Sequence, residues 1–288
     1  MPEIKFVKRL IAAPTVKTNI HSLTVPTITA KAVAELAKGL GYQSAKAVQS
    51  EDPVKFTYKA GQHVVSLFKN SGAVRYADAT RFQVDDGKAH IDVPDAEAQK
   101  LALAAAKQHN LFPGDTYKLL KVSRLTVGES GPETKKATSR VVDLGVCFQR
   151  TVSGVPVDGP GGKLVVYLDH KGEMTGFDRI WRPIKAVQSP VKALHPPTII
   201  EPSLARYWSL HGASLLQVDE VRFGYFELGY NDKQTVLQPA YVSLITLVGG
   251  DPNQPIKMRT VHVTPAATNA VGEIMPPPKK VVPQPRRQ

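Results

Sequence analysis

Residues 148–177, FQRTVSGVPVDGPGGKLVVYLDHKGEMTGF, carry the pattern from which the fold of this chain is best predicted. β-branched and aromatic residues fill the start of this stretch, the run at 163–168 and the run that begins at Met174. Between them, Pro156 favours a strand edge because it lacks an N–H donor, and the glycines of 159–162 allow the positive φ angles of tight turns. The stretch therefore predicts short consecutive strands that pair antiparallel through tight turns.

A similar pattern recurs along the chain and predicts repeated units. VVSLFKNSGAVRYADATRF (64–82) aligns, with one gap, to VVYLDHKGEMTGFDRIW (165–181), and the strands of 241–263 form a weaker third copy. Each copy is preceded by a stretch with apolar residues at helical spacing: 30–42, 94–109 and 201–212. We expect an α+β chain in which one helix packs on an antiparallel sheet, in about three copies.

The motif from Arg150 to Gly172 resembles the propeptide domains of thermolysin-type metalloproteases and the related PepSY-like modules. It combines Arg150, a Gly-Val-Pro-Val turn, a glycine-rich turn and a VYLDHKG hairpin, and LQPAYV from Leu237 to Val242 resembles the entry to the last hairpin of such modules. The resemblance covers roughly residues 94–265 and implies a PepSY/cystatin-like fold. It also implies an inhibitor, chaperone or regulator that acts in trans on a protein partner such as a protease.

The resemblance and the repeat pattern together divide the chain. We expect an N-terminal segment (1–28), a first helix-plus-sheet unit (29–92), a second, propeptide-like unit (93–185), a Pro-rich linker (186–200), a third, PepSY-like unit (201–268) and a basic Pro-rich tail (269–288).

Partner contacts are expected at the turn of the motif and at a nearby tryptophan. The expected residues are Arg150, Gly154, Val155, Pro156, Val157, Gly159 and Trp181. The proline and the glycines also have a purely structural interpretation, because they shape a hairpin whatever it contacts. Strand addition at an exposed sheet edge would bind a protein partner through backbone hydrogen bonds, without any catalytic group.

The sequence patterns of catalytic and metal sites do not occur. A phosphate loop would need glycine in place of Val157 and a hydroxyl residue in place of Leu164. None of the eight histidines pairs with another at spacings that favour a metal site. Cys147 is the only cysteine and lies among apolar residues, which indicates a buried thiol and excludes a disulfide framework. We expect a non-enzymatic chain with no cofactor and no bound metal.

Positive charge is concentrated at the end of the chain. The 37 Lys and Arg residues exceed the 25 Asp and Glu residues, giving a net charge of +12. Residues 276–288, PPPKKVVPQPRRQ, favour extended polyproline conformation, either as a disordered end or as an arm that docks in an aromatic groove or on an acidic partner. The expected contacts of such an arm, with an acidic partner or another polyanion, are Lys279, Lys280, Arg286 and Arg287. Elsewhere acids are interleaved with bases and aromatic residues make up 7%, so a nucleic-acid groove is not favoured.

Two other functions remain open at the level of sequence: a structural subunit joined to its neighbours through strand edges and the tail, and a small-molecule enzyme or binder with a pocket between helix and sheet. No apolar run is long enough to span a bilayer. Lys8 and Arg9 interrupt the first apolar stretch, so no signal peptide is predicted. We expect a cytoplasmic protein by default, although the resembled family is mostly exported and a removed leader stays open.

Overall fold

The computed structural model describes residues 2–42, 48–81, 91–114, 116–129, 138–208, 215–251, 254–272 and 274. The described part of the chain is mostly β, with about 50% of its residues in strands and 15% in helices. Contacts divide the chain into two compact units, each built from separate stretches of sequence. The larger unit contains Thr18–Pro190 and Gly224–Leu237, and the smaller one contains Met1–Lys17, Val191–Phe223 and Gln238–Gln288. Within the described ranges, no helix is long and apolar enough to cross a membrane.

The expected α+β fold of about three repeated helix-on-sheet units is wrong. Strand pairing instead produces a mixed sheet of 13 strands. The hairpins expected in separate units share this sheet, because residues 74–77 pair with residues 176–179 across the boundary between them. Alternating polarity predicts strands but does not say which strands become neighbours. The predicted PepSY/cystatin-like architecture and the predicted repeat are therefore wrong as well.

The sheet of the larger unit runs in the order β9-β8-β10-β11-β6-β5-β4-β3, and β7 pairs with β8 outside this path. Its strands are β3 (Val48–Glu51), β4 (Lys55–Ala60), β5 (His63–Phe68), β6 (Val74–Asp78), β7 (Thr116–Glu129), β8 (Thr138–Val152), β9 (Val155–Asp158), β10 (Lys163–Leu168) and β11 (Met174–Ile180). A second, three-stranded sheet contains β12 (Ile184–Pro190), β2 (Asn19–Leu23) and β14 (Val236–Leu237).

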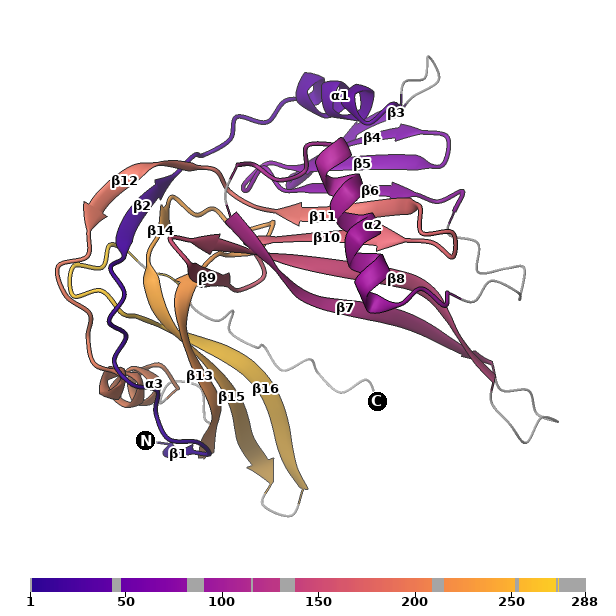
Figure 1. The fold of residues 1–288 in the computed structure, drawn as a ribbon. Helices are drawn as coiled ribbons and strands as arrows, with labels where there is room; N and C mark the ends of the chain where they lie inside the picture. The colour runs from indigo at the N-terminus through magenta and orange to yellow at the C-terminus, as the bar shows by residue number, and fades with distance from the viewer. Residues whose placement is uncertain are drawn as a thin grey trace, which may run out of the picture. The chain divides into compact units, whose positions relative to one another are not determined.

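Helices α1 (Ala30–Gly39) and α2 (Asp95–Gln108) pack on one face of the large sheet (Figure 1). The hydroxyl of Thr29 caps α1 by accepting a hydrogen bond from the Ala32 amide at 3.2 Å. In α2, acidic residues occupy the first turn, where their negative charge stabilises the helix by interacting with the positive end of its dipole. Fully buried alanines at every fourth position let α2 lie close to the strands: Ala98, Ala102 and Ala106.

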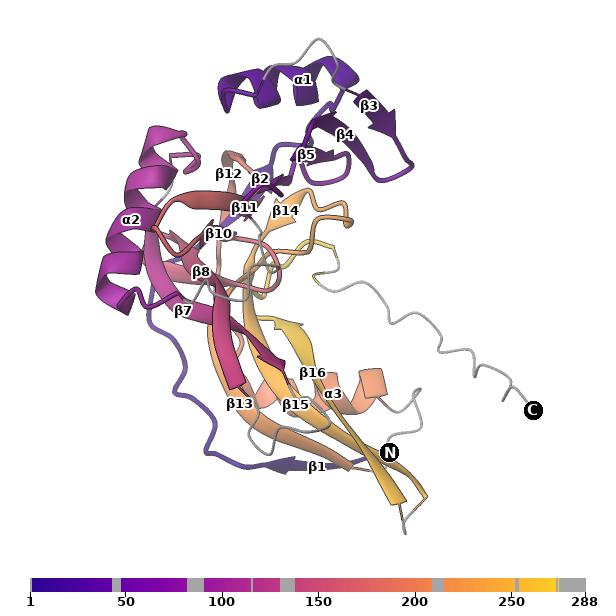
Figure 2. The same cartoon turned by 90° about the vertical axis from the view of Figure 1, so that its right-hand side faces the viewer.

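The described part of the smaller unit consists of strands and one α-helix. Helix α3 (Ile200–Trp208) follows a 3-10 turn (Pro197–Ile199) and packs beside β1 and β16, as Figure 2 shows. It buries Ile200, Leu204 and Trp208 at helical spacing. The strands of this unit are β1 (Glu3–Phe6), the first part of β13 (Leu215–Phe226), β15 (Pro239–Asp251) and β16 (Gln254–Pro265). The three helices predicted from spacing are therefore confirmed individually, although their assembly into repeats is not.

The glycine-rich turn after β9 is shaped by the backbone that passes against it. Gly159 has a φ of +99°, and a Cβ placed there would lie 2.4 Å from the carbonyl oxygen of Glu227. A Cβ on Gly161 would lie 2.5 Å from the carbonyl oxygen of Leu228. Glycine is required here because only a residue without a side chain permits this close approach.

Replacing Gly159 by alanine tests this requirement. We expect Gly159→Ala to lower the free energy of unfolding by about 3 kcal/mol, because steric overlap adds to the strain of a positive φ. Gly154→Ala is the matched control, since Gly154 has a φ of +79° but no atom within 4 Å of the added Cβ. Its cost is expected to be about 1 kcal/mol in urea denaturation. Equal costs for the two variants would contradict the steric argument.

Candidate functional site

Arg150, expected as a partner contact, lies in β8 with its side chain fully buried. Its Nη1 donates hydrogen bonds to the Arg182 carbonyl oxygen at 2.9 Å and to Glu227 Oε2 at 3.2 Å. Its guanidinium carbon lies 5.7 Å from the centre of the Trp181 ring, within the range of a cation–π contact. Arg150 is therefore part of the interior, where it joins three segments of the larger unit.

Glu227, like its neighbour Arg182, is a residue of this cluster that sequence reasoning missed. Its carboxylate accepts hydrogen bonds from the Arg182 backbone amide at 2.8 Å and from Arg182 Nη1 at 3.3 Å. Burial raises the pKa of Glu227, whereas the charges of both arginines and the Arg182 amide oppose that shift. Burial also lowers the pKa of Arg182, whose guanidinium donates to the carbonyl groups of Leu228, Gly229 and Asp232. No local pattern in the sequence marks Glu227 as the partner of arginines far along the chain.

The remaining expected contact residues are mostly buried as well. Val155, Val157 and Trp181 are buried, and Pro156 and Gly159 are half-buried. Gly154 lies at the surface of a turn, where its φ of +79° fits the structural interpretation. Residues 154–159 lie in the hairpin of β8 and β9 and in the turn after it, and of the other expected residues Trp181 contacts Arg150. Their role in partner contact stays a prediction. Lys279, Lys280, Arg286 and Arg287 lie outside the described residues.

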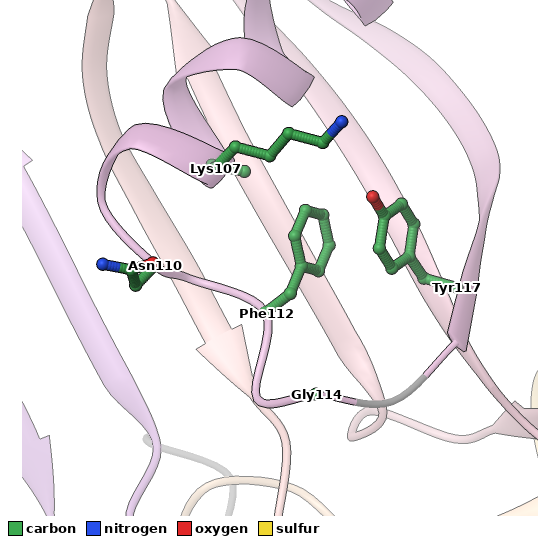
Figure 3. A pocket seen from close by; sticks show the side chains of 6 residues that line it. Lys107, Asn110, Phe112, Gly114 and Tyr117 are labelled. Atoms are coloured by element: carbon green, nitrogen blue, oxygen red, sulfur yellow. The ribbon is translucent and has the colours of Figure 1, made fainter.

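A surface depression is connected to the cluster of Arg150, Arg182 and Glu227 through aromatic side chains. Trp181 contacts Phe112 edge to face, with ring centres 6.2 Å apart. The Phe112 ring stacks on Tyr117 at 3.8 Å with an interplanar angle of 5°, and both rings contact Phe148 edge to face. The depression has a volume of about 320 Å³ and is lined by Ala106, Lys107, Asn110, Phe112, Gly114 and Tyr117 (Figure 3).

The end of α2 positions the depression. Asn110 takes a left-handed conformation, with a φ of 51°, which is typical of the residue that ends a helix. The Leu111 amide then donates to the Ala106 carbonyl oxygen at 2.8 Å, and the Leu111 side chain is buried. This reversal leaves Phe112 facing Tyr117, the second residue of β7, while Lys107 extends past the two rings from the last turn of the helix (Figure 3).

Strand β7 continues from the depression as an open sheet edge. It is 14 residues long, and in the described part of the chain it pairs with β8 alone. Three of its leucines are exposed: Leu119 at 36%, Leu120 at 40% and Leu125 at 52%. Lys118 and Lys121 are exposed too, and neither forms an ion pair with a described residue. The ladder with β8 shifts register between Leu119 and Lys121, so Leu120 is the extra residue of a β-bulge.

A serine and a histidine lie close together in the smaller unit. Ser203 Oγ of α3 and His262 Nε2 of β16 are 2.9 Å apart, and Thr264 donates to Ser203 Oγ at 3.1 Å. A catalytic dyad needs a group that orients the second ring nitrogen, whereas His262 Nδ1 has no hydrogen-bond partner among the described residues. We interpret the pair as a polar contact between helix and sheet. No group of three His, Cys, Asp or Glu side chains in the described ranges could hold a metal ion.

Comparisons with known proteins give a fold-level likeness. No family model matches the chain, and no curated protein matches it. The structure is similar to the crystal structure of an uncharacterized protein from Eubacterium rectale ATCC 33656, with a TM-score of 0.53 and 15% identity over 95% of this chain and 90% of that chain. At this identity the likeness concerns the fold alone. The expected PepSY-like and protease-inhibitor character gains no support from the comparisons or from the fold.

Removing the charge of Glu227 tests the buried cluster. We expect Glu227→Gln to lower the free energy of unfolding by about 3–5 kcal/mol, because two buried guanidinium groups lose their counter-charge. The control is Glu220→Gln, which breaks a 3.2 Å ion pair with Arg222 whose side chains are 43% and 50% exposed. The control is expected to cost less than about 1 kcal/mol in urea denaturation. A similar small cost for Glu227→Gln would contradict a stabilising role.

The pH dependence of stability tests the burial of His262. Burial lowers its pKa from 6.5 to about 4, so between these values the unfolded chain binds a proton that the folded chain does not. Stability is therefore lost as the pH falls, by about 2 kcal/mol between pH 7.5 and 5. His262→Gln is expected to remove this loss when both proteins are denatured with urea at each pH. Burial of Asp143, which raises its pKa to about 6, acts in the opposite direction and cancels in the comparison. Identical pH profiles would contradict the argument.

Proposed function

We propose that this chain is a non-enzymatic protein-binding module that holds an extended segment of a partner protein along the open edge of β7. The observation that supports the proposal best is the combination of a long unpaired edge and exposed leucines on the same strand. An exposed edge offers a row of backbone donors and acceptors that an extended segment can pair with. Side-chain contacts on the two faces of the added strand then give specificity.

The length of the edge favours a segment over a single contact. Strands in globular proteins usually contain about 5–6 residues, whereas β7 contains 14. The bulge at Leu120 divides the edge, and the stretch Lys121–Leu125 beyond it is paired with β8 without a shift in register. That stretch is long enough to pair with an ordinary strand. The depression at Tyr117 extends the same surface at the beginning of β7.

The other candidate functions have less support. The depression is open to solvent, whereas a ligand pocket usually buries most of its ligand, and its volume of about 320 Å³ lies at the lower end of the about 300–1,000 Å³ usual for such pockets. A structural subunit would also use strand edges, and β3 and β16 form the two ends of the main strand order among the described residues. The tail that this alternative needs lies outside those residues.

Blocking the edge chemically tests the proposal. A cysteine introduced as Leu125→Cys can be labelled with a large polyethylene glycol maleimide, because the native Cys147 is 4% exposed and burial raises its pKa. The control is Val187→Cys on β12, where the exposed fraction is 55% against 52% for Leu125. We expect the label at 125, but not at 187, to weaken partner binding about tenfold or more.

Binding is measured by surface plasmon resonance with the protein that the unlabelled chain captures from its native source. Equal binding by the two labelled forms would contradict the use of β7. A concentration-dependent mass of the unlabelled chain that is lost on labelling at 125 would favour self-association instead.

A further inference from the structure

We infer that the segment bound at β7 is acidic on one face and carries an aromatic side chain that seats in the depression beside Phe112 and Tyr117. This inference rests on the proposed function and names the chemistry of the partner. The occupant of the edge is an acidic extended segment of a different protein. Three features of the larger unit support this inference: the faces of the sheet on which the β7 side chains lie, the charges on those faces, and the stacked rings of Phe112 and Tyr117.

The register of β7 with β8 assigns its side chains to two faces. Directly opposed residues of an antiparallel ladder lie on the same face. Lys118 opposes Gln149 and Lys121 opposes Cys147, so both lysines lie on one face despite the bulge between them. On the other face, Leu119 opposes Phe148, which belongs to the core under the helices. A strand added to β7 alternates in the same way, so it presents every second side chain to the lysines.

The lysine face attracts negative charge. Neither Lys118 nor Lys121 forms an ion pair within the described ranges, whereas Arg124 is paired with Asp95 at 2.6 Å. Cross-strand pairs of opposite charge stabilise a sheet, and like charges destabilise it. Asp143 opposes Leu125 further along this face, which limits the basic stretch to the beginning of the strand. Acidic residues are therefore expected where the added strand passes Lys118 and Lys121.

The same charges argue against the other occupants of this edge. A second copy that paired through its own β7 would bring lysine against lysine. The tail of this chain contains Lys279, Lys280, Arg286 and Arg287 and no acid, so it is repelled as well. Lysines on an edge strand commonly prevent edge-to-edge aggregation, and that role alone would account for the two lysines. It does not explain the half-exposed aromatic pair, which an acidic partner segment would cover.

The aromatic pair provides a rigid anchor site. Phe112 and Tyr117 are half-buried, and the rings of Phe148 and Trp181 support them from below. A site whose rings are already held in place loses little conformational entropy when a ligand binds. An aromatic side chain gains offset or edge-to-face contacts with such rings. Lys107 at the rim adds a positive charge for a carboxylate next to the anchor.

Selection from a displayed library of random peptides of about twelve residues tests the inference on the full-length chain. We expect selected peptides to carry Asp or Glu at alternate positions and one aromatic residue. The double variant Lys118→Glu/Lys121→Glu should bind the selected acidic peptide about tenfold more weakly and select Lys and Arg instead. The control, Lys185→Glu/Lys257→Glu, makes the same change in net charge at exposed strand residues elsewhere and should leave affinity within about twofold.

The outcomes separate the inference from the proposed function. Peptides that lose binding when residue 125 is labelled but are neutral or basic would overturn the inference and leave the use of β7 standing. Acidic peptides without an aromatic preference, or with unchanged affinity for Tyr117→Leu, would overturn the anchor. Peptides that bind equally after labelling, or no enrichment at all, would overturn both.

Discussion

The carboxylate of Glu227 lies between two buried guanidinium groups, and the arrangement of the larger unit depends on this contact. Buried charges are costly unless each is paired and hydrogen-bonded. The side chain of Glu227 binds Arg150 and Arg182, and its backbone exchanges hydrogen bonds with Asp158 and Gly161 at 2.9 Å each. Residues from β8, from the segment after β9 and from the segment after β11 are thereby held against residues that follow β13. The glycines of the turn are needed because this backbone passes so close to them.

The buried cluster is connected to the surface through aromatic rings. Arg150 lies against Trp181, Trp181 contacts Phe112, and Phe112 stacks on Tyr117 at the start of β7. Each contact restricts the next ring, so the depression is built on rigid elements. Arg150 and Trp181, which were singled out from the sequence, therefore support the rings of Phe112 and Tyr117 from the interior. The surface itself is formed by the end of α2 and by β7.

Local features of the fold follow from the sequence, whereas its long-range pairing does not. Thr29 caps α1 and Asn110 ends α2 as their residue types predict. The hairpin of β10 and β11 also follows the prediction, because a short turn with a positive-φ glycine, Gly172, joins these neighbouring strands. The pairing of β6 with β11 joins segments about a hundred residues apart. The sequence pattern of each strand would be the same if the two strands belonged to separate sheets, so the pattern cannot predict this pairing. Glu227 was missed for the same reason, since its partner Arg150 is 77 residues away. The exposed edge of β7 becomes visible only once the order of the strands is known.

Hydrogen–deuterium exchange with and without a bound partner segment tests most directly whether β7 is the binding edge. If the segment adds to the sheet, amides of Lys121–Leu125 should exchange more slowly in the complex, because the added strand satisfies the outward-facing donors of β7. The amides of β12 and β16 should exchange at the same rate in both states. Slower exchange at those strands, with β7 unchanged, would contradict the account.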